Sequence, residues 1–350
     1  MQQNDPLDAI AALPPQYDVA DVERVVSEEY GLRGDLVPLV SERDQNFRLT
    51  TVDEERYVVK IANAAEARLT TEFQIQALLH MQKSNCRVAI PQIIRTLDAA
   101  LATRIQGKDS SNVVRVVSYV AGRPFERTRA DRRLAAELGS CLADIDSALR
   151  GFQHPGDNQS LLWDMQRASD LRRLMTHFRD DDLRALLHTC LDDFEKNAAP
   201  MLPKLRSQVI HNDLNPDNVL VTAGDPVAIA GVIDFGDMIR APLIIDVAIA
   251  AAYLHDEAAD PTALPAAFVG AYDASTRLED MEIDLLYYLV RMRLATTLTI
   301  LNWRLGARSE DDAYTIKSLQ GGRSTERFLA RVSAMPAAEF ARRIRQQCGR

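Results

Sequence analysis

Between Gln208 and Asp237, short apolar runs alternate with polar turns. The apolar runs are Val209-Ile210, Val219 to Val221 and Val227 to Ile233, and turn sequences such as Asn-Pro-Asp and Gly-Asp-Pro lie between them. Runs of this length bounded by such turns are typical of buried strands. The pattern therefore predicts three strands, with one polar loop after the first strand and another after the third.

Strand patterns also occur in the first third of the chain. Segments 47–52 and 56–62 alternate apolar and polar residues around Asp53-Glu54-Glu55, which predicts a β-hairpin. Segments 91–97 and 112–120 predict two further strands, and the second is rich in β-branched residues.

Helical periodicity marks most of the remaining chain. Asp18 or Asp21 can cap a helix that ends at Gly31. Four apolar residues share one face of a predicted helix over residues 66–83: Leu69, Phe73, Ala77 and Met81. Residues 130–206 are mostly amphipathic helix, and more helices are predicted at about 243–256, 263–273, 279–305 and 310–334.

The strand-rich and helix-rich parts meet at Gly122-Arg123-Pro124, which interrupts both patterns. We therefore predict a bilobal α+β protein. Residues 1–120 form a β-sheet N-lobe with one prominent helix, and residues 121–350 form a mostly helical C-lobe.

Composition narrows the class of protein. The chain has 350 residues, of which 47% are hydrophobic and 26% charged, as in an ordinary soluble globular protein. The formal net charge of −9 argues against a nucleic-acid partner. The longest apolar run, Leu243 to Leu254, is interrupted by Asp246 and is too short for a membrane span. The N-terminus lacks a basic region before its apolar stretch, so we expect no signal peptide.

The four cysteines lie far apart and form no C-x-x-C pair. This spacing indicates neither a zinc site nor a disulfide framework. A reducing cytoplasm is the expected location.

The two polar loops between 208 and 237 contain the residues best suited to catalysis. His211-x-Asp213, Asn218 and Asp234-Phe235-Gly236 follow one another in the order H-x-D-x-x-x-x-N and then D-F-G, which is the protein-kinase pattern. In that chemistry a carboxylate orients the acceptor hydroxyl and takes its proton. An amide oxygen and a second carboxylate hold the magnesium that bridges the nucleotide phosphates. We predict Asp213 as the base and Asn218 with Asp234 as the metal ligands.

Lys60 and Glu72 admit two interpretations. Lys60 lies on the second strand of the predicted hairpin, on the face opposite Val59, and is either a solvent-facing lysine or a phosphate ligand. Glu72 flanks the apolar stripe of the next helix, where a glutamate is usually solvated. The order of strand lysine and then helix glutamate is the one that kinases use for an internal ion pair.

These motifs resemble the aminoglycoside phosphotransferase and choline kinase superfamily, and within it the hydroxylysine-kinase-like branch. The stretches that carry the resemblance are SERDQNF (41–47), YVVKIAN (57–63), VVRVVSYVAGRP (113–124), FQHP (152–155), HNDLNPDN (211–218) and GVIDFGDMIRAPLIIDVAIA (231–250). They extend over both predicted lobes. The resemblance implies a protein-kinase-like fold.

The resemblance also implies residue roles. Lys60, paired with Glu72, would orient the phosphates. The backbone of Ser118, Tyr119 and Val120 would form a hinge that faces the nucleobase. His211 and Asp246 would steady the catalytic loop, and Asp246 would otherwise be an unpaired carboxylate inside an apolar helix.

Three features depart from protein kinases. The loop from Ser41 to Asn46 contains no glycine, which leaves open how it covers the phosphates. Asn212 replaces the arginine of H-R-D. Asp246 follows Asp234 by only a dozen residues, which leaves no room for a long activation segment. A small acceptor is therefore favoured over a protein.

We predict a small-molecule kinase that transfers the γ-phosphoryl group of ATP or GTP, with Mg²⁺, to a hydroxyl of a small amine or amino acid, with hydroxylysine-like acceptors favoured. Homoserine, choline or an aminoglycoside are alternative acceptors. A pseudokinase scaffold that binds nucleotide is the alternative from another class.

Candidate acceptor ligands are an acid and an arginine. Asp237 could bind the amine, although it could equally be a turn residue that caps the next segment. Arg291 and Arg293 are two positions apart on one helix, so at most one should face the cleft. The resemblance favours Arg293 as the ligand of an acceptor carboxylate.

Overall fold

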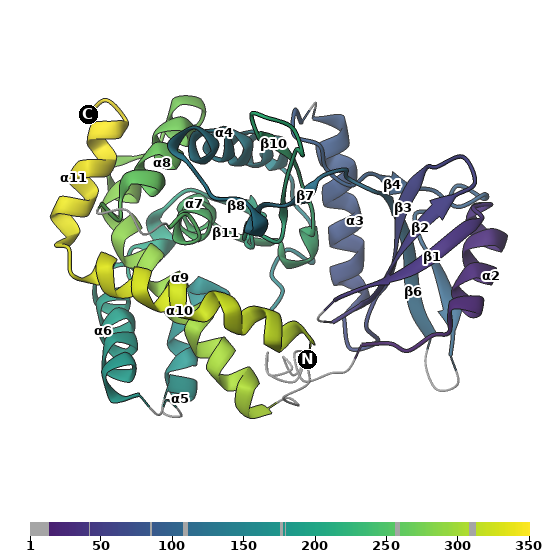
Figure 1. Cartoon of the computed structure of the whole chain (residues 1–350), viewed down its shortest axis with the longest axis horizontal. Helices are drawn as coiled ribbons and strands as arrows, with labels where there is room; N and C mark the ends of the chain where they lie inside the picture. Colours follow the sequence, from purple (N-terminus) through teal and green to yellow (C-terminus); the bar gives the residue numbers. More distant parts are fainter. Residues whose placement is uncertain are drawn as a thin grey trace.

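The computed structural model describes residues 14–41, 43–84, 86–107, 111–175, 178, 180–255, 260–307 and 313–350. An antiparallel sheet lies at one end of the molecule and a large group of helices at the other, with helix α3 between them (Figure 1). This arrangement is the two-lobed α+β fold that the sequence predicts.

The N-lobe sheet has the strand order β1-β2-β3-β6-β4, with β5 also paired to β6. The strands are β1 (Gly34–Leu39), β2 (Gln45–Thr51), β3 (Arg56–Ile61), β4 (Ile93–Ile94), β5 (Thr103–Gln106) and β6 (Ser111–Ser118). The β2–β3 hairpin confirms the predicted alternation. Strand β4 is shorter than predicted, and the sequence pattern did not indicate β5.

Each face of this sheet has its own packing partner. Phe47, Leu49, Val59 and Ile61 are buried on one face in a core shared with α2 (Val19–Tyr30). Lys60 alternates with these residues and therefore lies on the opposite face, beside α3 (Arg68–Lys83) and the C-lobe.

The buried side of α3 belongs to the C-lobe core. Phe73, Ala77 and Met81 are fully buried there, as predicted. Leu69, which the sequence placed in the same stripe, is 42% exposed instead.

The C-lobe is built around the long helix α9 (Asp280–Ala307), which packs most extensively against four other helices. Those helices are α6 (Asp181–Asn197), α7 (Leu243–Ala252), α10 (Ala313–Ser333) and α11 (Ala337–Gln347). The remaining elements are α4 (Arg132–Leu149), α8 (Ala263–Ser275), α5 (Arg172–Met175) and short 3₁₀ segments at Phe125–Arg127, Met165–Leu171, Leu202–Lys204 and Phe235–Asp237. Gly139 lets α4 and α8 approach closely, because a Cβ there would lie 2.1 Å from the Phe268 carbonyl oxygen.

Two small antiparallel sheets carry the polar loops. Strand β9 (Val219–Val221) pairs with β10 (Ile229–Val232) and β7 (Arg123–Pro124), and β8 (Ser207–Ile210) pairs with β11 (Ile239–Pro242). The three strands predicted between 208 and 237 are present. None of the described helices, α7 included, is long and apolar enough to cross a bilayer.

Candidate active site

A buried carboxylate on α7 binds the backbone of the loop that follows β8. Asp246 is fully buried, and its two oxygens each accept a backbone N–H at 2.8 Å, one from His211 and one from Asn212. Burial raises the pKa of Asp246, and these two backbone hydrogen bonds oppose the rise. The geometry fits the loop-stabilising role that the resemblance implies.

The imidazole of His211 joins the two polar loops. Its Nδ1 accepts the Asp213 backbone N–H at 3.3 Å, and its Nε2 lies 3.2 Å from the Ile233 carbonyl oxygen. The ring also packs edge-on against Phe235, with 4.8 Å between centroids. His211 therefore fixes the distance between the loop that carries Asp213 and the loop that carries Asp234.

Asp213 is surrounded by hydrogen-bond donors. Its Oδ1 accepts from Nη2 of Arg293 at 2.7 Å. Its Oδ2 accepts from the side-chain amides of Asn215 at 2.8 Å and Asn218 at 3.0 Å. Burial raises the pKa of Asp213 to about 7, although Arg293 opposes the rise. A carboxyl with this pKa is suited to accept a proton near neutral pH.

Asn218 and Asp234 come from adjacent elements. The Asn218 carbonyl oxygen accepts the Ile233 backbone N–H at 2.9 Å, which sets Asp234 beside it. The Asn218 amide nitrogen faces Asp213, so its Oδ1 is the atom available for a cation. The Lys60 ammonium lies 3.4 Å from Asp234 Oδ1, and its charge lowers the pKa of Asp234 to about 2.

An ionised carboxylate beside an amide oxygen is a donor set that Mg²⁺ accepts, with phosphate and water oxygens for its other positions. Within the described part of the chain, no group of three His, Cys, Asp or Glu side chains is arranged to hold a metal. A cation at Asn218 and Asp234 would therefore depend on the nucleotide for part of its coordination.

The predicted ion pair between Lys60 and Glu72 is wrong for this structure. Glu72 is half exposed and pairs with Arg68 one turn earlier, at 2.8 Å, and Lys60 pairs with Asp234. Helical geometry explains the error, because the residue of α3 that faces the sheet is Gln74, two positions further on.

Gln74 is buried and bridges both lobes. Its Oε1 accepts from Nη2 of Arg115 on β6 at 2.5 Å, and its amide donates to the Gly236 carbonyl oxygen at 3.1 Å. A neutral amide therefore occupies the position where an α3 glutamate was expected.

The predicted hinge runs from the end of β6. The Ser118 N–H donates to the Gln92 carbonyl oxygen at 2.9 Å, and the Tyr119 N–H donates to the Arg56 carbonyl oxygen at 3.1 Å. The backbone N–H groups of Ser118 and Tyr119 are therefore bonded within the N-lobe. Val120 is the remaining residue of the predicted hinge.

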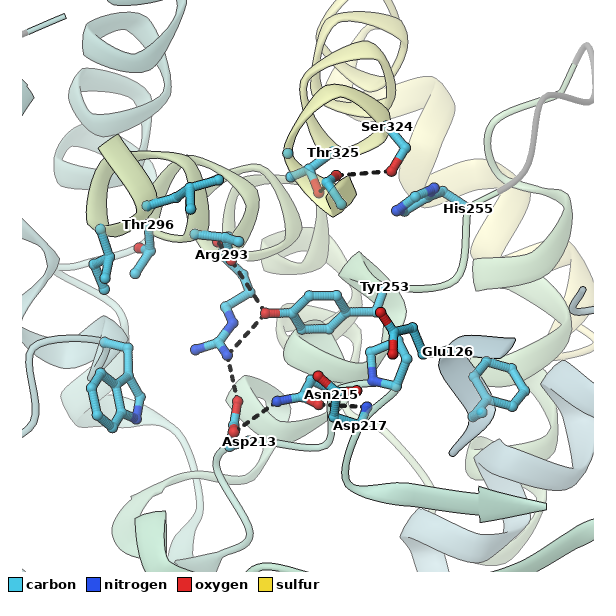
Figure 2. A pocket seen from close by; sticks show the side chains of 18 of the residues that line it. Glu126, Asp213, Asn215, Asp217, Tyr253, His255, Arg293, Thr296, Ser324 and Thr325 are labelled. Carbon is cyan, nitrogen blue, oxygen red and sulfur yellow. Dashed lines mark hydrogen bonds and ion pairs between the residues drawn. The ribbon is translucent and has the colours of Figure 1, made fainter. Parts of the chain in front are cut away.

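A cavity of about 790 Å³ opens beside Asp213 (Figure 2). Its lining comes from the catalytic loop, α9, α10 and the segment after β7. Carboxylates and arginines both contribute: Glu126, Asp213, Asp217, Asp237, Arg129, Arg293 and Arg304. Such a mixture suits a ligand with both charges better than a purely apolar one.

Arg291 and Arg293, two positions apart on α9, have different surroundings, as the helical spacing predicts. Arg291 is buried against Asp193, at 2.6 Å, and Ser333. Arg293 lines the cavity and donates to Asp213 and, at 3.1 Å, to the Tyr253 hydroxyl (Figure 2). Arg291 is thus the structural residue of the pair.

Asp237 also lines the cavity, but it is not an isolated acid. Its carboxylate forms an ion pair with Arg43, from the connection between β1 and β2. Its carbonyl oxygen accepts from the Asn212 side chain at 3.1 Å. Asn212, which replaces the arginine of H-R-D, therefore ties the two polar loops together.

The residues of this site that the sequence did not indicate include Arg43, Trp163, Asn215 and Tyr253. Asn215 had a signal, because a polar residue two positions after the base can reach it. Trp163 and Tyr253 are brought to the cavity only by tertiary packing and had no local signal.

The fold and these loops define a kinase-like phosphotransferase. A model of the phosphotransferase enzyme family matches residues 35–281, which is more than half of the chain. The chain belongs to this family, and it is a small-molecule phosphotransferase.

Similar proteins agree with this assignment. Hydroxylysine kinase of Danio rerio is 24% identical over 346 residues, covering 94% of this chain and 95% of the relative. Hydroxylysine kinase of Mus musculus is 24% identical over 334 residues, covering 89% of each.

Solved structures with the same fold include several small-molecule kinases. An amicoumacin kinase in complex with AMP-PNP and Ca²⁺ has a TM-score of 0.67 at 14% identity, covering 92% of this chain and 95% of the other. A spectinomycin phosphotransferase in complex with ADP has a TM-score of 0.64 at 13% identity, covering 92% of this chain and all of the other.

Proposed function

We propose that this protein transfers the γ-phosphoryl group of ATP or GTP to a hydroxyl of a small amino acid or amine, with hydroxylysine-like amino alcohols as the favoured acceptors. The observation that carries the proposal is the ion pair of Asp213 with Arg293 at the wall of a charged cavity. It puts the candidate base beside a cation that suits an acceptor carboxylate. The names of the relatives support the choice of acceptor.

The nucleotide half of the site would use residues from both lobes. Lys60 would orient the phosphates, and Asn218 with Asp234 would hold Mg²⁺, whose charge offsets that of the phosphates. The Val120 backbone would face the nucleobase. Every residue type carries the same backbone groups, so the sequence does not select between ATP and GTP, and the proposal covers both as donors.

Asp213 would act as the base for the acceptor hydroxyl. Arg293, Asn215 and Asn218 fix the orientation of its carboxylate. Phosphoryl transfer requires mainly positioning and charge stabilisation. This chain would supply the positioning by holding one carboxylate against three side-chain donors.

Arg293 would also bind the acceptor. Its side chain is only 5% exposed, and its Nε and Nη1 have no hydrogen-bond partner among the described residues. Leaving buried donors unsatisfied is costly, and a ligand carboxylate would satisfy them if the guanidinium turned toward the cavity, because neither atom is exposed in this structure. An amine at the other end of the ligand would be drawn to the cavity acids, with Asp237 the nearest to the Asp234 loop.

The test is a panel of hydroxylated amines and amino acids assayed with Mg·ATP and Mg·GTP for release of the nucleoside diphosphate. We expect turnover with hydroxylated amino acids. The Arg293→Ala variant should reduce kcat/KM about tenfold more for a carboxylated acceptor than for its decarboxylated analogue, as expected when one charged hydrogen bond is lost.

The decisive quantity is the ratio of the kcat/KM losses for the two acceptors. Arg293 also contacts Asp213, so some loss of kcat/KM is expected with both acceptors. Arg291→Ala is the matched control on the same helix. It should lower stability and leave the ratio unchanged. An unchanged ratio in Arg293→Ala would remove Arg293 from the acceptor site, and no turnover with any member of the panel would contradict the proposed acceptor class.

A further inference from the structure

The connection between β1 and β2 has no glycine, and hydrogen bonds hold its described residues Arg43 and Asp44. The Arg43 carbonyl oxygen accepts from the Asn63 side-chain amide at 3.0 Å, and the Asp44 carboxylate accepts the Asn63 backbone N–H at 3.2 Å. Asn63 lies two residues after the end of β3, which carries Lys60. The loop is therefore anchored to the strand that provides the candidate phosphate lysine.

The Arg43 side chain extends from this loop across to the C-lobe. Its guanidinium pairs with Asp237 and lies 5.3 Å from the centre of the Trp163 ring. Both partners also line the acceptor cavity. Arg43 is thus at the junction between the nucleotide half and the acceptor half of the site.

Arg43 is also close to the candidate metal ligand. A Cβ on Gly236 would lie 3.2 Å from Asp234 Oδ1 and 3.8 Å from Nη2 of Arg43. The guanidinium therefore lies over Gly236, and Lys60 approaches the same carboxylate oxygen of Asp234 at 3.4 Å. Two cations of the N-lobe converge on the place where the last phosphate of a nucleotide would be transferred.

We propose that Arg43 is a phosphate-binding residue, and that it exchanges Asp237 for oxygens of the terminal phosphate when a nucleoside triphosphate binds. The guanidinium fork suits phosphate oxygens, with which it can form two parallel hydrogen bonds. The glycine-free loop would then bind the phosphates through one arginine side chain, where a glycine-rich loop uses backbone N–H groups. The exchange also leaves the Asp237 carboxylate to the acceptor amine.

The competing explanation is that the ion pair of Arg43 with Asp237 only holds the lobes together. The two explanations differ in the effect of Asp237→Asn. If Arg43 exchanges partners, this variant frees the arginine and should bind a triphosphate analogue as tightly as the wild type or more tightly. If the pair is a permanent link, Asp237→Asn should weaken binding as Arg43→Gln does.

The inference rests on the proposed nucleotide site, so the experiment measures binding and needs no acceptor. Calorimetry would compare Mg·AMP-PNP with Mg·ADP, and Mg·GMP-PNP with Mg·GDP, for the wild type, Arg43→Gln, Arg43→Lys and Asp237→Asn. Arg24→Gln is the matched control, because Arg24 forms exposed ion pairs on α2 far from the cleft.

We expect Arg43→Gln to weaken binding of the triphosphate analogue roughly tenfold to hundredfold and to change binding of the diphosphate by less than about twofold. Arg43→Lys should recover part of the loss, because it keeps the charge and loses the fork. Arg24→Gln should match the wild type.

Two results would overturn the inference: equal losses for both nucleotides in Arg43→Gln, or weakened triphosphate binding in Asp237→Asn. A wild-type protein that binds none of the four nucleotides would instead contradict the proposed function as a whole, and this inference with it.

Discussion

Asn212 and Asp234 both adopt left-handed backbone conformations, with φ of 64° and 59°. Residues other than glycine rarely do so, and Asn and Asp tolerate it best because their short polar side chains form local hydrogen bonds. Here Asp246 accepts the Asn212 N–H, and Asp234 accepts the Gly236 N–H at 3.4 Å. The backbone strain is thus supported where it aims Asp213 and Asp234 toward the cleft.

The first prediction concerns the base. Asp213→Asn should lower kcat about a hundredfold or more, because a positioned general base is lost, and should leave nucleotide affinity largely intact. Steady-state kinetics and calorimetry with Mg·AMP-PNP would measure the two quantities. Asp53→Asn, in the exposed turn between β2 and β3, is the control. Near-wild-type kcat in Asp213→Asn would exclude Asp213 from the mechanism.

The second prediction concerns the cation. Mg²⁺ should be obligatory, so excess EDTA should abolish turnover. Asp234→Ala should raise the Mg²⁺ concentration for half-maximal activity at least about tenfold, since even indirect ligand partners have effects of that size. A Mg²⁺ titration of both proteins would test this. Unaltered metal dependence in the variant would contradict the assignment of Asp234.

At the scale of single residues, the sequence indicated residues within short motifs better than it indicated the long-range partners of a side chain. The structure brings His211, Asp213, Asn218 and Asp234 together, as their spacing within two short loops indicates. The ion partner of Lys60 could not be predicted, because it depends on which face α3 turns to the sheet. The role of Arg43 could not be predicted either, because its partner Asp237 is 194 residues away in the sequence.

Helix α3 is the element that connects the N-lobe sheet to the Asp234 loop. The link runs through Gln74, which bonds Arg115 of β6 and the carbonyl oxygen of Gly236. Glu72 lies on the exposed side of the helix. Among the described residues, its hydrogen-bond partner is its helical neighbour Arg68. Gln74 and Glu72, which lie in one turn of α3, should therefore contribute very differently to stability and to catalysis.

The third prediction follows from this difference. Gln74→Ala should lower the free energy of unfolding by about 1–3 kcal/mol, because Arg115 loses a buried acceptor, and should also reduce kcat/KM. Glu72→Ala should change stability by less than about 0.5 kcal/mol, as expected for an exposed pair. Chemical denaturation and steady-state kinetics would measure both.

A double-mutant cycle extends the test. Lys60→Ala and Glu72→Ala should have additive effects on kcat/KM, since the two residues have separate partners. Strong coupling between them would show that Lys60 and Glu72 form an ion pair in the working enzyme.

Element order was predictable where periodicity was strong, as in the β2–β3 hairpin and in α9. Strand β5, Thr103–Gln106, was not, because a four-residue strand is too short to show its alternation. Strand β4 was overestimated because only Ile93 and Ile94 of the predicted segment 91–97 pair with β6. Pairing partners, which are tertiary information, decide where such short strands end.

For the whole molecule, the order of a strand-rich segment before a helical one was enough to predict two lobes. The contacts that close the lobes on each other were not predictable. Besides the packing of α3 on the C-lobe core, they include single long-range pairs such as Lys60 with Asp234 and Arg43 with Asp237. Such pairs leave no periodic signal in a sequence.

Beneath the catalytic loop, buried polar groups from several elements of the C-lobe meet. Asp146 of α4 is 2% exposed and accepts from the Tyr272 hydroxyl of α8 at 2.7 Å. Burial, and then the charge of Asp246 on α7, raise the pKa of Asp146 well above its usual value, while Arg206 opposes the rise. Asp146 therefore favours its protonated form, which can share its proton with Asp246.

The last prediction is a pH dependence of stability. A carboxyl whose pKa is higher in the folded than in the unfolded chain binds more protons when folded. Folding stability therefore falls as pH rises from the unfolded value, about 3.9, toward the folded pKa of Asp146. Asp146→Asn removes this contribution, because an amide resembles the protonated acid: its oxygen can accept from Tyr272 and its NH₂ can donate to Asp246.

We expect the stability of Asp146→Asn, relative to the wild type, to increase as pH rises above about 4. Thermal unfolding of both proteins at a series of pH values would measure the difference, which cancels the titration of groups that both share. Asp246→Asn is the informative comparison. It loses an acceptor for one of the two loop N–H groups and should be destabilised by about 1–3 kcal/mol at every pH. Parallel stability profiles for the wild type and Asp146→Asn would mean that Asp146 is ionised in the folded protein, and that Arg206 outweighs burial and the charge of Asp246.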